Sequence, residues 1–171
     1  MKPQRIGEIL VQRGVLTQQQ VDQLIDHQQQ TGRPLGWLAE QHFGIEPTEI
    51  EEAWAEQYAG LTRTIDPEFE VYADEAAELV TRRQAWQFCV LPIRFDENQL
   101  LVATTQRHLR RALRFATNVI GVPVFFVLAE PLALGEAMCK RYPLPGLTPE
   151  SVEDENALNG LLDQAKHERA A

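Results

Sequence analysis

The sequence predicts an α+β protein, in which two repeated helical hairpins precede a small mixed β-sheet backed by helices. The first observation behind this prediction is an internal repeat over residues 5–57. The second is a set of segments rich in β-forming residues, separated by helical patterns, which together typify a sheet covered by helices. The segments are residues 86–95, 100–104 and 124–128.

The same observations predict three parts of the chain. Residues 1–60 should form a helical repeat domain, and residues 61–142 an α+β domain. Several prolines and a glycine then predict a linker with a possible C-terminal helix over residues 143–171. We expect the helix of this tail to be mobile until a partner binds it, because isolated short helices are marginal in water.

The repeat has an offset of 29 residues, and each copy reads as two helices joined by a short turn. One copy cannot bury its apolar face alone, so we expect the copies to pack on each other. Gly14 suits the left-handed position after a first helix, and Thr17 with Gln20 forms a capping-box pair that opens a second. The corresponding positions are Ile6 and Leu35, Gly7 and Gly36, Ile9 and Leu38, Leu16 and Ile45, Val21 and Ile50, Leu24 and Ala53, Ile25 and Trp54, and Gln28 and Gln57.

The second part of the chain is predicted from its local patterns. Residues 61–65 suit a short edge strand, and residues 67–83 a helix that ends at Arg82 and Arg83. A turn at residues 96–98 predicts a hairpin between the first two β segments. Helices are expected over residues 106–116 and 131–142.

Composition limits the possible functions. The chain has 171 residues, of which 44% are hydrophobic and 24% charged, so it can fill a core. Its net charge of −9 argues against DNA or RNA binding, which needs a basic face. No apolar run approaches the roughly 18 residues of a membrane helix, and the N-terminus leads into an amphipathic helix rather than a signal peptide. We therefore expect a cytoplasmic protein.

Motifs for catalysis or metal binding do not occur in the sequence. It contains no Gly-x-x-x-x-Gly-Lys-Ser/Thr phosphate loop and no nucleophile elbow. Cys89 and Cys139 lack metal-ligand spacing, so we interpret them as small core residues. The four histidines lack zinc-like partners and are interpreted as surface residues. We therefore expect that the protein is not an enzyme, has no ATPase activity and binds neither a metal nor a cofactor.

The run at residues 5–16, closing at Gln28, resembles the repeated motif of the N-terminal domain of type II secretion and type IV pilus assembly ATPases. This domain is the GspE N-terminal, or MshEN-like, domain, and some members bind cyclic di-GMP through two tandem motifs. The resemblance covers roughly residues 5–142. We interpret the chain as a stand-alone, non-catalytic version of this domain with a degenerate second motif. In that motif Pro34, Ala39, Glu40 and Phe43 stand where the first copy has Arg5, Leu10, Val11 and Gly14.

The resemblance implies a cyclic di-GMP site at the seam of the two repeats. Arg5 would pair with or stack on a guanine or a phosphate, the glycines would allow close approach of the backbone, and the glutamines would donate hydrogen bonds. Alternatively, Arg5 is a solvated residue, the glycines are tight helix contacts, and the glutamines bridge two helices. The candidate ligand residues are Arg5, Gly7, Leu10, Gly14, Gln28, Leu35, Gly36, Leu38 and Gln57.

Two further segments are candidate partner sites. Arg107, Arg110, Arg111 and Arg114 occupy neighbouring helical turns and form one positive face. This face could receive an acidic partner, the phosphates of a dinucleotide or the chain's own acidic tail, or it could simply be solvated. In the tail, Leu158, Leu161 and Leu162 fall at helical spacing and could dock in a partner's groove.

Three functions therefore remain open. The first is an adaptor that docks to a secretion, pilus or envelope component, and the resemblance implies the inner-membrane platform protein as partner. The second is a cyclic di-GMP receptor in which the ligand shifts the packing of the two repeats. The third is a purely structural domain.

Overall fold

The structure is a computed structural model that describes residues 2–160. The chain divides into two compact units, Met1–Leu61 and Thr62–Ala171. The first unit is built of helices, and the second contains a three-stranded sheet with helices around it. The predicted α+β class is therefore confirmed.

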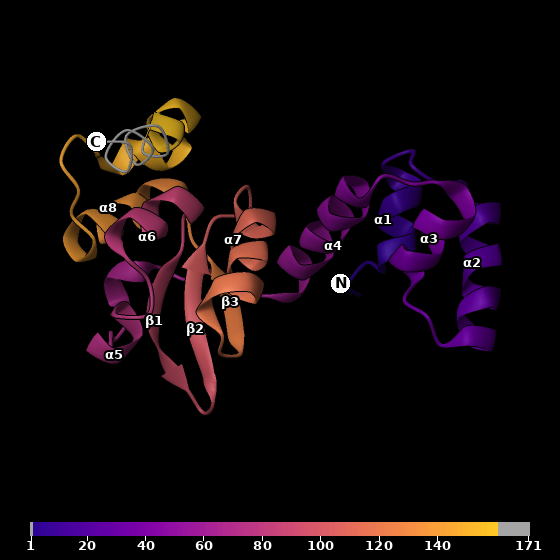
Figure 1. Cartoon of the computed structure of the whole chain (residues 1–171), viewed down its shortest axis with the longest axis horizontal. Helices are drawn as coiled ribbons and strands as arrows, with labels where there is room; N and C mark the ends of the chain where they lie inside the picture. Colours follow the sequence, from indigo (N-terminus) through magenta and orange to yellow (C-terminus); the bar gives the residue numbers. More distant parts are fainter. Residues whose placement is uncertain (1, 161–171) are drawn as a thin grey trace, which may run out of the picture. The chain divides into compact units, whose positions relative to one another are not determined.

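The helical unit consists of two hairpins that clasp each other. Its helices are α1 (Ile6–Gln12), α2 (Gln18–Thr31), α3 (Leu35–Phe43) and α4 (Pro47–Leu61). Packing is crosswise, because α1 of the first hairpin contacts α4 of the second, and α2 contacts α3. Figure 1 shows the four helices grouped in this way. The expected packing of the two repeats on each other is confirmed.

Local sequence explains where these helices begin and end. The Thr17 hydroxyl accepts a hydrogen bond from the Gln20 amide at 3.2 Å, and the Gln20 side chain accepts one from the Thr17 amide at 2.8 Å. This reciprocal pair is the predicted capping box of α2. At the other end of α2, Gly32 adopts a left-handed conformation with φ of 68°, which glycine takes without strain.

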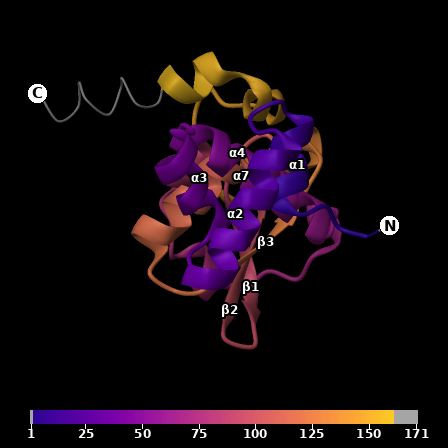
Figure 2. The same cartoon turned by 90° about the vertical axis from the view of Figure 1, so that its right-hand side faces the viewer.

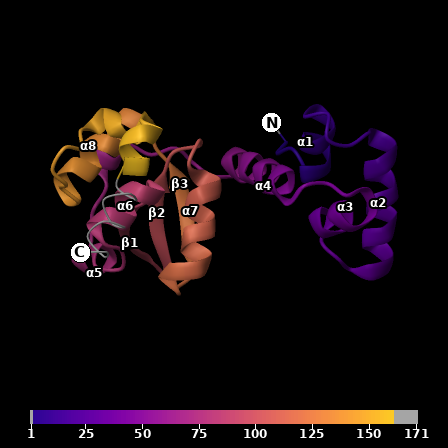
Figure 3. The same cartoon turned by 45° about the horizontal axis from the view of Figure 1, so that its top comes forward.

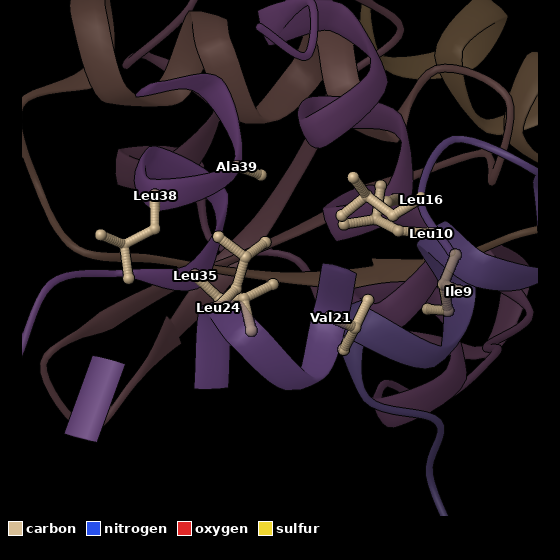
Figure 4. Close-up of a cluster of buried hydrophobic side chains, with 9 residues drawn as sticks. Ile9, Leu10, Leu16, Val21, Leu24, Leu35, Leu38 and Ala39 are labelled. Carbon is tan, nitrogen blue, oxygen red and sulfur yellow. The ribbon is translucent and has the colours of Figure 1, made fainter. Parts of the chain in front are cut away.

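A small apolar core holds the two hairpins together. Figure 4 shows this cluster of side chains, with labelled residues on α1, α2, α3 and the turn between α1 and α2. Burial of these side chains supplies most of the stability of so small a unit. The buried residues are Ile9, Leu10, Leu16, Val21, Leu24, Leu35, Leu38, Ala39 and Ala53.

The second unit is built on a mixed sheet. Strands β1 (Leu91–Asp96) and β2 (Gln99–Thr104) form an antiparallel hairpin, and β3 (Val124–Leu128) pairs parallel to β2. Figure 2 shows the hairpin loop at one end of the sheet. The predicted edge strand at residues 61–65 is reduced to a single parallel bridge between Thr64 and Leu128.

Helices cover this sheet. Figures 1 and 3 show α7 beside β3. Burial of the Trp86 indole on α6 is matched by a 2.7 Å hydrogen bond from its Nε1 to the Tyr142 carbonyl. The helices are α5 (Asp74–Ala77), α6 (Arg82–Phe88), α7 (Leu109–Phe115) and α8 (Pro131–Arg141), with a 3-10 turn at Pro67–Phe69 and a π-helical turn at Ala116–Ile120.

One predicted helix in this unit is wrong. Residues 67–83 were expected to form a single helix, but the chain there makes the 3-10 turn, α5 and then the start of α6. A second capping box explains the break, because Thr81 and Gln84 exchange hydrogen bonds at 3.0 and 3.1 Å. The helix therefore begins at Arg82 instead of ending there, and β1 begins at Leu91 rather than at Trp86.

The predicted linker is also corrected over the described residues. A 3-10 turn at Pro149–Glu153 packs on α8, and residues 155–160 are helical. Val152 and Leu158 are fully buried. Figure 1 shows this yellow segment lying over α8. The described part of the tail thus belongs to the core of the second unit.

Candidate functional site

A pocket of about 940 Å³ lies in the helical unit and is lined by both hairpins. Its walls come from the starts of α1 and α3 and from one face of α2 and of α4. The lining residues are Arg5, Ile6, Gly7, Glu8, Gln18, Val21, Ile25, Gln28, Gln29, Pro34, Leu35, Gly36, Trp37, Glu40, Pro47, Ile50, Glu51, Trp54 and Gln57.

The lining has an approximate two-fold symmetry that follows the sequence repeat. Eight pairs of lining residues are separated by 29 positions, so each hairpin contributes the same positions to opposite walls. A pocket with this symmetry arises because the hairpins clasp crosswise. The pairs are Arg5 and Pro34, Ile6 and Leu35, Gly7 and Gly36, Glu8 and Trp37, Gln18 and Pro47, Val21 and Ile50, Ile25 and Trp54, and Gln28 and Gln57.

Six of the nine ligand residues expected from the sequence line this pocket. They are Arg5, Gly7, Gln28, Leu35, Gly36 and Gln57. The other three do not. Leu10 and Leu38 are core residues with exposed fractions of 0% and 2%. Gly14 lies in the turn after α1 and lines a shallow surface with Arg13 and Gly44.

The two lining glycines are needed for helix packing. A Cβ on Gly7 would lie 2.8 Å from Cγ1 of Val21, and one on Gly36 would lie 2.6 Å from Cγ2 of Ile50. These distances are too short for carbon atoms, so each glycine permits close packing of the two helices within its own hairpin. This is the alternative of tight helix contacts that the sequence left open.

Two lining polar groups hold the N-terminal segment. The Glu8 carboxylate accepts a hydrogen bond from the Arg5 backbone amide at 2.9 Å, which caps α1. The Gln57 side chain donates a long hydrogen bond of 3.5 Å to the carbonyl of Gln4. Arg5, which lines the pocket, is thus held in place by its backbone.

Two tryptophans in the pocket were missed as site residues. Trp37 is 44% exposed and Trp54 is 41% exposed, although indole rings are usually more buried. The guanidinium carbon of Arg33 lies 5.1 Å from the Trp37 ring centroid, within the range of a cation–π contact. The sequence repeat could have identified both residues. Trp54 occupies the position equivalent to Ile25, and Trp37 the position equivalent to Glu8.

The turn after α3 keeps the left-handed position of the turn after α1. Gly14 has φ of 73° and Gly44 has φ of 63°. Because α3 extends to Phe43, the glycine that follows it comes one position later than in the first copy. Phe43 in place of Gly14 is therefore an extra helical residue that leaves the second hairpin intact.

The two contacts between the hairpins, α1 with α4 and α2 with α3, differ in chemistry. On one side Arg13 makes ion pairs with Glu49, Glu52 and Glu56 along α4. Between α2 and α3, the position equivalent to Arg13 holds His42 and the position equivalent to Glu56 holds His27. The two imidazole rings stack with centroids 4.5 Å apart. An ion-pair network is thus replaced by a ring stack.

The predicted positive face of α7 is partly engaged within its own unit. Arg107 pairs with Glu155 of the tail at 2.6 Å, and the Arg111 guanidinium carbon lies 5.6 Å from the Phe88 ring centroid. Arg110 is half-buried and Arg114 is exposed. Of the alternatives left open, the structure realises the tail contact at Arg107.

His108 is buried, which corrects its interpretation as a surface residue. Its Nδ1 lies 2.7 Å from the Thr105 hydroxyl. Burial, together with the nearby Arg107 and Arg111, lowers the pKa of His108 to about 4. The ring is therefore neutral at pH 7.

One of the three tail leucines predicted to bind a partner differs from expectation. Leu158 is fully buried in the second unit, so it is not available for docking to a partner. Leu161 and Leu162 lie outside the described residues.

A second cavity of about 480 Å³ lies between the 3-10 turn at residues 67–69 and α8. The Arg141 guanidinium carbon lies 3.7 Å from the Tyr72 ring centroid, and the Tyr72 hydroxyl donates to the Pro67 carbonyl at 2.7 Å. Burial raises the pKa of Tyr72 to about 12. None of the predicted site residues lies in this cavity.

Within residues 2–160, no helix is both long and apolar enough to cross a membrane, and no group of three potential metal ligands occurs. Cys89 and Cys139 are free, and burial raises the pKa of the Cys89 thiol to about 12. A reactive thiolate at Cys89 is therefore disfavoured.

One protein family matches more than half of this chain. The family described as the MshEN domain matches residues 59–146, just over half of the chain. The chain belongs to the MshEN domain family. The predicted relation to the N-terminal domain of secretion and pilus assembly ATPases is thereby confirmed.

Two known proteins are similar to this chain. The type IV pilus assembly ATPase PilB of Thermus thermophilus is 27% identical over 158 residues, which cover 92% of this chain. The chain spans 17% of the length of that relative. A solved structure described as MshE with cdg is 23% identical, covers 81% of this chain and 99% of its own, and has a TM-score of 0.44.

The extent of the MshEN match is informative about the two units. It runs from Ala59 to Gly146, so it covers the strands and the helices α5 to α8 of the sheet unit but only the last residues of α4. MshEN is a non-catalytic N-terminal domain, and the relatives that carry it are complete ATPases. The alignment with PilB covers 92% of the chain, so it includes most of the helical unit as well.

Proposed function

We propose that this MshEN domain is a non-catalytic adaptor, and that the pocket of its helical unit holds a segment of a protein partner. The single observation that carries the proposal is the pair of half-exposed tryptophans in one pocket. Tryptophan is the residue most enriched among those that dominate binding energies at protein interfaces. Two indoles and Ile25, which is 37% exposed, form an apolar surface that is open to solvent.

The pocket is suited to binding because it is already formed. It rests on the buried core of the clasp, so little ordering is needed when a partner binds. Its volume of about 940 Å³ accommodates several side chains of a docked helix. Helix-in-groove docking is a common way for a helical surface to recognise a partner.

The partner class follows from the relatives. A curated relative is a type IV pilus assembly ATPase. The resemblance to the type II secretion family, in turn, implies the cytoplasmic region of an inner-membrane platform protein as partner. We therefore propose a secretion or pilus component as partner and the cytoplasm as the compartment where the contact forms.

Isothermal titration calorimetry with the purified cytoplasmic region of the platform protein from the same organism tests the proposal. Trp54→Ala should weaken binding by about 30-fold or more, because loss of a buried interface tryptophan costs about 2 kcal/mol or more. Phe69→Ala is the matched control, because Phe69 is 80% exposed and lies in the sheet unit. Equal affinities for wild type and Trp54→Ala would refute docking at this pocket.

Cyclic di-GMP is a second candidate ligand, favoured by a separate observation. The pocket brings Arg5, Gln28 and Gln57 together with two indoles. A guanidinium and two amides can pair with guanine and phosphate, and aromatic rings stack on bases. If cyclic di-GMP binds, it should raise the melting temperature of the protein. A ligand at 100 times its dissociation constant stabilises the folded state by about 2.7 kcal/mol. Arg5→Ala should abolish the shift, and no shift in the wild type would end this candidate.

A further inference from the structure

Two apolar side chains of the sheet unit project almost fully into solvent. Phe69 is 80% exposed and Val71 is 76% exposed, the highest values among the large hydrophobic side chains of residues 2–160. Glu70 between them has an extended backbone with φ of −85° and ψ of 150°, so the two side chains leave the chain on the same side. A single exposed apolar residue is ordinary, but two on one side of a short segment form an apolar surface.

The segment that carries these side chains is held firmly in place. Arg94 donates hydrogen bonds to the Glu70 carboxylate at 2.6 Å and to the Val71 carbonyl at 3.4 Å. On the following residue, the Tyr72 hydroxyl donates to the Pro67 carbonyl at 2.7 Å. A surface that is already ordered loses little conformational entropy when a partner covers it.

The cavity of about 480 Å³ adjoins this segment and continues the surface onto α8. Its lining includes Glu68 and Glu136, which are exposed and make no ion pair within residues 2–160. The basic residues of the lining are Lys140 and Arg141, and the Arg141 guanidinium is held over the Tyr72 ring. The two carboxylates are therefore open to a cation from a partner.

Carboxylates dominate the charge around the segment. Residues 65–81 contain six acidic residues and no lysine, arginine or histidine. Within the described chain, Glu70 alone among them has an ion-pair partner, and the bases that contact the segment or line the cavity are Arg94, Lys140 and Arg141. Three bases thus stand against seven carboxylates once Glu136 is included, and such a surface attracts a basic partner. The six acidic residues are Asp66, Glu68, Glu70, Asp74, Glu75 and Glu78.

We propose that Phe69, Val71 and the adjoining cavity form a second docking surface, which holds a basic and apolar segment of a further protein partner. Apolar side chains of this partner cover Phe69 and Val71. A lysine or arginine beside them enters the cavity, where Glu68 and Glu136 accept its hydrogen bonds. This surface belongs to the sheet unit and the pocket to the helical unit, so the chain can bind two partners, as an adaptor must.

Nuclear magnetic resonance of the full chain, labelled with nitrogen-15, provides the test. The probes are three synthetic peptides that share a core of leucine and phenylalanine and differ only in flanking residues, which are lysine, glutamine or glutamate. We expect the lysine peptide to shift the amide signals of Phe69, Val71 and Tyr72. It should bind about tenfold tighter than the glutamate peptide at low salt, and the difference should shrink at high salt.

One pair of variants tests the apolar contact. Phe69→Ala with Val71→Ala should weaken binding of the lysine peptide by about tenfold or more, because both side chains would be covered in the complex. Leu61→Ala with Val119→Ala is the matched control, since these side chains are 61% and 52% exposed elsewhere in the chain. The control should bind the peptide as the wild type does.

A second pair of variants separates local charge from net charge. Glu68→Gln with Asp74→Asn should remove most of the preference for the lysine peptide. Glu46→Gln with Asp26→Asn is the matched control, because both residues are exposed in the helical unit and the change in net charge is the same. The control should keep the preference.

Several results would overturn this second docking surface. These are equal binding of the three peptides, no binding of any peptide, a lysine preference that survives in Glu68→Gln with Asp74→Asn, and peptide binding that Trp54→Ala abolishes. The last result would place the peptides in the pocket of the helical unit. Binding of the platform fragment is measured separately and should not change in Phe69→Ala, so either docking proposal can fail while the other stands.

Discussion

Gly135 on α8 provides the sharpest test of the packing between α8 and the tail. A Cβ at this position would lie 2.1 Å from the carbonyl oxygen of Pro149 and 2.7 Å from its carbonyl carbon and Cα. These are backbone atoms, so no change of rotamer relieves the overlap. In Gly135→Ala the segment at residues 149–153 must move by more than about 1 Å to reach an ordinary contact distance.

The expected loss of stability follows from what this movement exposes. Val152 and Leu158 are fully buried, and burial of an aliphatic side chain is worth about 1.5–3 kcal/mol. Detachment of both would cost about 3–6 kcal/mol, while alanine gains about 1 kcal/mol over glycine inside a helix. We therefore expect Gly135→Ala to destabilise the sheet unit by about 2–5 kcal/mol.

Hydrogen exchange measured by mass spectrometry, together with thermal unfolding, provides the assay. Amides of Ser151, Asp154 and Leu158 donate to carbonyls within the tail and should exchange faster in the variant. Gly60→Ala is the control, because Gly60 is helical and a Cβ there meets nothing within 4 Å. It should stabilise its helix by up to about 1 kcal/mol. If Gly135→Ala behaved like Gly60→Ala, the argument from close packing would be wrong.

Two more predictions concern a glycine and a histidine. Gly36→Ala should destabilise the helical unit by up to about 2 kcal/mol, since overpacking against Ile50 outweighs the gain in helix propensity. Urea unfolding of this variant, of Ile50→Ala and of the double variant should show strong non-additivity, and additive effects would contradict the contact. His108 has a folded pKa of about 4, below its unfolded value of about 6.5, so protons bind the unfolded chain better and stability should fall as pH drops from about 6.5 to 4. The His108→Gln variant should lose this part of the pH dependence, and an unchanged profile would show that His108 does not cause it.

Much of the fold could be predicted because its signals are local. The Thr17–Gln20 capping box, Pro47 at the start of α4 and strand β3 at Val124–Leu128 all form where the sequence indicates. The error at residues 67–83 has a physical cause, because apolar periodicity there was read across Thr81. The second capping box at Thr81 and Gln84 was the missed signal.

The site was harder to predict, because it depends on which face each helix presents to its partner. The repeat placed Arg5, Gln28 and Gln57 correctly at the seam, but equal spacing also put Leu10 and Leu38 there, and they are buried in the core. The contact of Arg107 with Glu155 joins residues 48 positions apart, and no local pattern encodes it. Packing of the tail on α8 was missed for the same reason. In the sequence Gly135 is an ordinary glycine within a helix, and only the structure shows that Pro149 packs against it.

The two repeats differ most where folding constrains them least. Core pairs such as Leu10 and Ala39 or Leu24 and Ala53 stay apolar and are fully buried in both hairpins. At the pocket, by contrast, Glu8 is replaced by Trp37, which is 44% exposed. Since an exposed position contributes little to stability, its chemistry is free to follow a ligand. The asymmetry of the pocket, whose two tryptophans both come from the second repeat, is therefore better explained by what the pocket binds than by how the two hairpins fold.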